Sequence, residues 1–89
     1  MEPGEAAGPG ALIAQTRAAR GLTVEDLSRA TRLRPGLLEQ FEDDDFTASG
    51  GDAYARGHLR GIAVILDLDP DTLLALYGTS TTVRRPPGA

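Results

Sequence analysis

The sequence predicts an all-α fold of five short helices. Signals that start or end a helix recur throughout residues 10–77, and they leave little room for β-strands. The 89-residue chain has no cysteine, so neither a disulfide framework nor a thiolate metal site can hold it together. A chain this short buries only somewhat more than half of its unfolded surface. We therefore expect one domain, stabilised by the packing of a single core.

The two ends of the chain differ in composition from the segment between them. Residues 1–9 fall in MEPGEAAGPG, which is rich in Gly and Pro and has no apolar periodicity, so they are predicted to form a disordered arm. Residues 78–89, GTSTTVRRPPGA, have a similar character and predict a flexible tail or the start of a linker. The helical domain is then expected over residues 10–77.

The first two helices are predicted from their ends. The Ala-rich stretch ALIAQTRAAR favours a helix that stops at Gly21, a residue suited to the left-handed conformation after a helix. Thr23 then begins a second helix, and Asp26, three residues later, completes a pattern typical of a capping box. One side of this helix carries Val24, Leu27 and Ala30.

The remaining three helices have equally clear starts. Pro35 suits the first turn of a third helix, which continues through Leu37, Leu38 and Phe41. The break TASGG precedes a fourth and longest helix over residues 52–66. Asp69 and Pro70 predict the start of a fifth, whose inward residues would be Leu73, Leu74 and Tyr77. Phe41, Phe46 and Tyr77 are expected in the core, and because the chain has only four aromatic residues, each should matter for stability.

The distribution of charge argues mildly against nucleic acid as a partner. The net charge is −4, whereas neutralising phosphates requires a basic surface. Five acidic residues fall within residues 39–45, and most arginines lie before them.

The longest apolar stretch, Ile62 to Leu66, is far shorter than the roughly 20 residues of a membrane span, and the N-terminus lacks a signal-peptide pattern. The chain is expected to be soluble, monomeric and cytoplasmic.

Two segments carry a resemblance to a known family. The helix-turn-helix of Xre/Cro-type repressors resembles the first segment, RAARGLTVEDLSRATRLRPGLLEQFEDDDF. A more specific resemblance comes from the second segment, YARGHLRGIAVILDLDPDTLLALY. Together the two segments are similar to the N-terminal cytoplasmic domain of RodZ cell-shape proteins. Three motifs in the same order carry this similarity: an acidic third helix that ends at a Phe, a helix with the pattern aromatic-x-Arg-Gly-x-Leu-Arg, and a helix start with Leu-Asp-Pro. The resemblance covers about residues 12–77. It implies a domain that a downstream segment, absent here, anchors in the membrane.

A DNA-binding transcriptional regulator of the Xre class is the alternative. In such proteins the third helix enters the major groove, and the first residue of the second helix often grips a phosphate. That residue is Val24, which has no donor, and the third helix would present Glu39 and Asp43 outward. The DNA contacts left to this alternative are Arg32, Arg34 and Gln40. The acids at 43–45 are either an ordinary solvated surface or a face that repels DNA.

The fourth helix carries the candidate partner-binding residues. At 100° per residue its core face comprises Ala55, Leu59, Ile62, Ala63 and Leu66, and a neighbouring stripe within about 60° comprises Tyr54, His58, Gly61 and Ile65. RodZ-like domains contact the actin homologue MreB through this helix, with two aromatic residues four apart. The resemblance places these contacts at Tyr54 and His58, where His replaces the usual aromatic. Arg56 and Arg60 would form the polar rim.

Interpretations of these residues without a role in partner binding stay open. Tyr54 could cap the core against Phe46, and His58 could be exposed without a role. The domain could also be a regulator that binds some other protein. An enzyme is not expected: one histidine and no cysteine give no transition-metal cluster, SGGD lacks the lysine and the strand of a phosphate-binding loop, and His58 is the sole candidate base. No cofactor and no metal are predicted.

Overall fold

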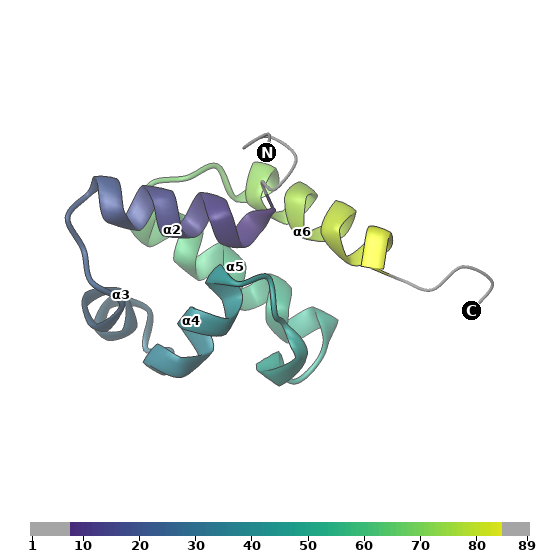
Figure 1. Cartoon of the computed structure of the whole chain (residues 1–89), viewed down its shortest axis with the longest axis horizontal. Helices are drawn as coiled ribbons and strands as arrows, with labels where there is room; N and C mark the ends of the chain where they lie inside the picture. The colour runs from purple at the N-terminus through teal and green to yellow at the C-terminus, as the bar shows by residue number, and fades with distance from the viewer. Residues whose placement is uncertain (1–7, 85–89) are drawn as a thin grey trace.

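The computed structural model describes the backbone of residues 8–84 and the side chains of residues 8–78. This part of the chain is helical and contains no strand, which confirms the all-α prediction. Figure 1 shows α2 and α5 crossing the body of the domain, α3 and α4 at one end, and α6 leading away at the other. The elements are α2 (Pro9–Ala19), α3 (Val24–Thr31), α4 (Pro35–Glu42), the 3-10 turn η1 (Thr47–Ser49), α5 (Asp52–Leu66) and α6 (Pro70–Arg84).

The helix starts follow from local side-chain chemistry, as the sequence predicted. Thr23 Oγ1 accepts a hydrogen bond from the Asp26 amide at 3.0 Å, and the Thr23 amide donates to Asp26 Oδ2 at 2.9 Å, so the capping box is complete. Pro35 and Pro70 are the first residues of α4 and α6, where a missing amide proton costs nothing. Gly21, with φ 71°, takes the left-handed conformation expected after α2.

Both ends of the helical region differ from the expected boundaries. The first helix already begins at Pro9, which is buried together with Gly10, although the sequence predicts an arm over residues 1–9. The last helix runs to Arg84, beyond the expected end at residue 77, because each residue added to an anchored helix costs little. Residues 1–7 and 85–89, where the rest of the arm and tail predictions fall, lie outside the described residues.

The core lies between α5 and the other helices. All five residues predicted for the core face of α5 are fully buried, and they pack with Ile13, Leu27, Leu38 and Leu73. Phe41, Phe46 and Tyr77 form a connected aromatic cluster, with ring centroids 4.8 Å apart in the first pair and 5.0 Å in the second. Ala30 is exposed, so α3 reaches the core through Leu27 and the half-buried Val24.

Candidate functional site: the outer face of α5 and the adjoining groove

The outer face of α5 carries the large hydrophobic side chains that are exposed among the described residues. The large hydrophobic side chains that remain exposed are Tyr54 at 64%, Val64 at 68% and Ile65 at 40%, and all three belong to this helix. Gly61 is exposed between them. We call Tyr54, Gly61, Val64 and Ile65 the α5 ridge. It extends about 16 Å along the helix, because eleven residues separate its two ends.

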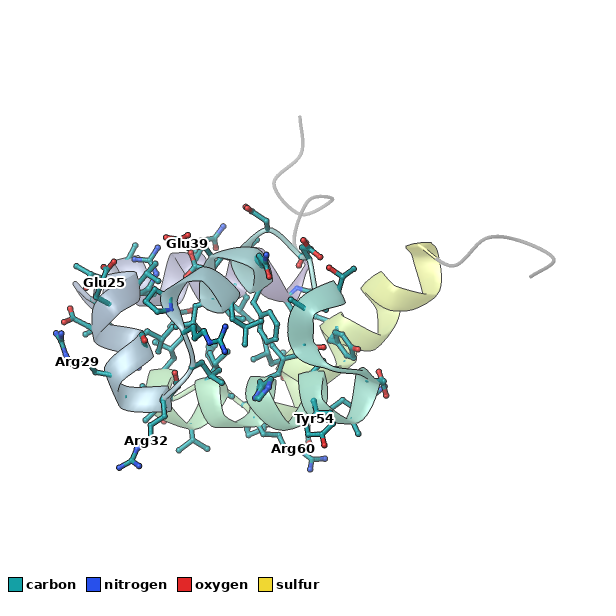
Figure 2. The ribbon with its side chains drawn as sticks, turned by 90° about the horizontal axis from the view of Figure 1, so that it is seen from below. Glu25, Arg29, Arg32, Glu39, Tyr54 and Arg60 are labelled. Carbon is teal, nitrogen blue, oxygen red and sulfur yellow. The ribbon has the colours of Figure 1, made fainter. Side chains whose placement is uncertain are left out.

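Tyr54 points away from the body of the domain. Figure 2 shows its side chain and that of Arg60 on the same edge of the molecule, directed outward. Phe46 packs instead between Phe41 and Tyr77, so Tyr54 does not cap the core against it. Gly50, in the loop before α5, lies beside the Tyr54 ring: a Cβ built there would be 3.5 Å from Tyr54 Cδ2, an ordinary van der Waals distance. Three of the four aromatic residues therefore serve the core, and the fourth is exposed.

The two arginines expected at the rim of this face have different surroundings. Arg56 turns toward α6: its Nε donates to Asp52 Oδ2 at 2.9 Å, and its guanidinium lies 5.3 Å from the centre of the Tyr77 ring. Asp52 also accepts a 2.7 Å hydrogen bond from the Tyr77 hydroxyl, and these two bonds hold the pKa of Asp52 below its ordinary value of 3.8. Among the described residues, Arg60 has no ion pair, so no carboxylate offsets its charge as Asp52 offsets that of Arg56.

His58 lies at the border between the α5 ridge and a groove. It is half-buried, and its ring centre is 6.1 Å from that of Phe41, whereas Tyr54 one turn earlier is exposed. The groove has a volume of about 530 Å³ and runs between the α3–α4 turn, α4, η1 and α5. Its lining residues are Arg32, Leu33, Arg34, Gly36, Leu37, Gln40, Ala48, Ser49 and His58. We call it the α4–α5 groove.

The groove brings together residues to which the sequence gives two different functions. Arg32, Arg34 and Gln40 are the DNA contacts of the alternative interpretation, and His58 is a partner contact on the fourth helix. Their assembly depends on the way α4 packs beside α5, which helix periodicity does not reveal. Val64 was also missed, although a 100° projection places it next to Gly61 and away from the core face. That projection was the signal that could have found it.

Three acidic side chains of segment 39–45 accept hydrogen bonds or pair with an arginine within the domain, so both interpretations of the segment hold only in part. Glu42 forms an ion pair with Arg17 on α2, at 2.7 Å between Oε2 and Nε. Asp44 Oδ1 accepts a 2.8 Å hydrogen bond from the Gly10 amide in the first turn of α2. Asp45 Oδ1 accepts from both the amide and the hydroxyl of Thr47. Only part of the run is thus free to form a solvated or DNA-repelling face.

Glu39 and Asp43 remain on the outer surface of the helix that would read DNA. Both are exposed, and Figure 2 places Glu39 on the edge opposite Arg32 and Tyr54. Val24, at the first position of α3, packs against the core and offers no phosphate donor. Gln40 is exposed at the groove. A DNA backbone laid along α4 would therefore meet carboxylates on one side and the two arginines on the other.

Two other kinds of site are absent from the described residues. In residues 8–84 no three or more His, Cys, Asp or Glu side chains group as metal ligands would. Within the same range, none of the helices has the length and apolar character that crossing a membrane requires.

The chain matches known proteins along most of its helical region. A family described as "Helix-turn-helix domain" matches residues 12–73. An uncharacterized protein of Haemophilus influenzae is 38% identical over 66 residues, which are 73% of this chain and 22% of that protein. The cytoskeleton protein RodZ of Streptococcus pneumoniae is 27% identical over 74 residues, 83% of this chain and 27% of that protein. The chain thus spans about a quarter of these relatives. No solved structure gives a significant match.

Proposed function

Because the chain belongs to the family of helix-turn-helix domains found at the N-termini of RodZ proteins, we propose that it is a cytoskeletal adaptor domain. Its partner would be an actin-like filament protein of the MreB type, bound through the α5 ridge. The role is one of protein binding and not of catalysis. The observation that carries the proposal is that the large exposed hydrophobic side chains of residues 8–78 all lie on α5.

The α5 ridge has the composition of a protein-binding surface. A tyrosine can bury its ring and still hydrogen-bond through its hydroxyl, which makes it a common energetic centre of interfaces. Gly61 leaves a gap between Tyr54 and Ile65 into which a partner side chain could fit, because nothing lies within 4 Å of a Cβ built there. Arg60, which has no ion pair among the described residues, would supply a charged rim.

A DNA-binding regulator has less support. Base contacts in this fold would come from α4, whose outer surface carries the exposed Glu39 and Asp43. Two unit charges about 4 Å apart in water repel by roughly 1 kcal/mol, so two carboxylates offset a single favourable contact from Gln40. The α5 ridge, in turn, would make no contact that a complex with DNA requires. The adaptor proposal accounts for both features.

We further propose that the domain acts in the cytoplasm and is tethered to the membrane by a downstream segment. The support is the length of the relatives, which are about four times as long as the aligned segments. In this arrangement the α5 ridge would hold the filament close to the membrane. A fluorescent fusion of the whole protein should follow the filament pattern in cells, and Tyr54→Ala should make its distribution diffuse.

Co-sedimentation with polymerised actin homologue from the same host tests the binding surface. Tyr54→Ala should weaken binding by more than about 1 kcal/mol, since truncating a central interface aromatic removes both contact area and a hydrogen bond. Gln15→Ala is a matched control, because Gln15 is an exposed helical residue on α2, away from the ridge. Circular dichroism should give the same thermal midpoint for both variants. Equal binding by Tyr54→Ala and wild type would refute the proposal.

A further inference from the structure

The α4–α5 groove has a chemistry that the proposed adaptor function does not use. Its volume of about 530 Å³ lies in the range of sites that hold a small ligand or a few side chains. The groove is open to solvent along the α3–α4 turn, where Arg32 and Arg34 are exposed. The α5 ridge lies beyond its His58 border. The groove and the ridge are therefore adjacent but separate surfaces.

The charge of the groove is opposite to that of the chain. The chain has 13 acidic and 9 basic residues, yet none of the lining residues is acidic and two are arginines. Arg17, Arg20, Arg29 and Arg56 each have a carboxylate partner. Among the described residues, Arg32 and Arg34 have none. Two unpaired guanidinium groups beside a groove without carboxylates favour an anionic ligand.

The floor of the groove is apolar. Leu33 and Leu37 are half-buried and pack against the core, and Ala48 lies across from them on η1. Gln40 and His58 add groups able to donate and accept hydrogen bonds. A simple inorganic anion would leave this apolar surface uncovered. The lining thus fits a ligand that combines carboxylates with at least one apolar side chain, which is the chemistry of an acidic peptide segment.

The α3–α4 turn holds the two arginines in place. Arg32 ends α3 in the left-handed conformation, with φ 64°, an uncommon one for a residue with a side chain. The Ser28 hydroxyl donates to the Leu33 carbonyl, and the Leu33 amide donates to Thr31 Oγ1 at 3.3 Å. Arg34 is exposed and has no ion pair among the described residues, so its guanidinium is available. A turn fixed in this way lowers the entropic cost of binding.

We propose that the α4–α5 groove binds an acidic peptide segment of a protein partner, with carboxylates on Arg32 and Arg34 and an apolar side chain over Leu33 and Leu37. A DNA backbone is the less favoured occupant, because duplex binding needs a longer basic surface and would also bring phosphates toward the exposed carboxylates of Glu39 and Asp43. This inference does not depend on filament binding by the α5 ridge. The groove would add a second attachment point to the domain.

Fluorescence anisotropy with a labelled peptide of glutamate and leucine residues tests the proposal on the purified chain. The peptide should bind saturably and more weakly as salt is raised. Arg34→Glu should weaken binding about tenfold, as expected when an attractive charge becomes repulsive. Arg60→Glu is the matched control: it makes the same charge change at another exposed arginine without an ion pair among the described residues, and should alter affinity less than about twofold.

Two further measurements test whether the groove itself holds the peptide. Ala48→Phe changes no charge but fills the groove, and it should also abolish peptide binding, whereas Tyr54→Ala should leave it intact. A labelled DNA duplex is tested with the same variants. Equal peptide binding by Arg34→Glu and Arg60→Glu, or no saturable binding to wild type, would overturn the proposal. Tighter binding of the duplex than of the peptide, lost in Arg34→Glu, would overturn it in favour of nucleic acid.

Discussion

Arg17 on α2 and Glu42 at the end of α4 form a two-point ion pair. Arg17 Nε lies 2.7 Å from Glu42 Oε2, and Nη2 lies 3.1 Å from Oε1. The third guanidinium nitrogen donates to the Leu22 carbonyl at 2.9 Å. The two side chains are only 19% and 12% exposed, and the hydrogen bond to Glu42 raises the pKa of Arg17 further above its ordinary range. An acidic residue of the helix that would read DNA thus holds two helices together.

Replacing Glu42 should therefore destabilise the domain. Glu42→Ala leaves the Arg17 guanidinium largely buried without its carboxylate, and we expect a loss of about 2 kcal/mol in the free energy of unfolding. Asp43→Ala, at the next position, removes an exposed carboxylate and should change stability by less than about 0.5 kcal/mol. Urea unfolding followed by circular dichroism measures both. Similar losses in the two variants would show that the ion pair contributes nothing specific.

The hydrogen bond between Tyr77 and Asp52 should make stability depend on pH in acid. The Tyr77 hydroxyl donates to Asp52 Oδ1 at 2.7 Å, and this bond is the largest cause of the lowered pKa of Asp52; the bond from Arg56 is the next. A carboxyl whose pKa is lower in the folded state stabilises the protein above its unfolded pKa. That contribution is lost as the pH falls through the folded value.

Tyr77→Phe tests this coupling while keeping the ring in the core. The variant should be less stable than wild type at neutral pH, and the pKa of Asp52 should rise toward 3.8. The difference in stability should shrink as the pH falls below about 4, because Asp52 becomes protonated in both proteins. Thermal unfolding at several pH values and an NMR titration of the Asp52 carboxyl measure the two effects. A difference that stays constant down to about pH 2 would contradict the coupling.

Two helical glycines should respond in opposite ways to alanine. A Cβ at Gly10 would lie 2.4 Å from the Phe41 carbonyl oxygen and 2.5 Å from that of Glu42, so α2 could not keep its approach to α4. Gly10→Ala should cost about 1–3 kcal/mol through overpacking. Nothing lies within 4 Å of a Cβ at Gly57 in α5, and Gly57→Ala should stabilise the domain by about 0.5–1 kcal/mol. Urea unfolding compares the two; loss of stability in both would refute the distinction.

The parts of the fold that the sequence predicted correctly depend on neighbouring residues. The Thr23 capping box joins residues three apart, Pro35 and Pro70 mark helix starts by their own geometry, and α5 has the predicted bounds. The internal contacts of Glu42 and Asp44 were missed because their partners are distant in sequence. Glu42 and Arg17 are 25 residues apart, and Asp44 and Gly10 are 34 apart. Helix periodicity contains no information about such pairs.

The candidate site was likewise predicted only in part from the sequence. Helix projection placed Tyr54 and Ile65 outside the core face of α5, and both are exposed. The same projection could not show that Arg56 turns toward Tyr77, because the position of α6 decides this. Nor could it show that His58 shares a groove with Arg32 and Arg34, which come from a turn more than twenty residues earlier. Helical periodicity predicted three of the four ridge residues and missed Val64, while only the packing of the helices revealed the groove.

The exposed carboxylates of Glu39 and Asp43 on the outer surface of α4 should be sufficient to prevent the domain from binding DNA. Glu39→Lys with Asp43→Lys would replace both carboxylates by positive charges, in addition to those of Arg32 and Arg34 on the other side of α4. We expect this double variant to bind a DNA duplex that wild type does not bind. Its affinity should fall steeply as salt is raised, because binding would come from contacts with phosphates. An electrophoretic mobility shift assay at low and moderate salt measures the gain.

A matched double variant separates the position of the charges from their number. Glu25→Lys with Asp71→Lys changes the net charge by the same amount at exposed residues of α3 and α6. If the surface of α4 decides the outcome, this control should bind the duplex much more weakly than the α4 variant does. Its two lysines lie on different helices and cannot both be on the helix that enters the major groove of DNA. Equal binding by the two variants would mean that net charge alone keeps the domain from DNA, and the orientation of α4 would then explain nothing.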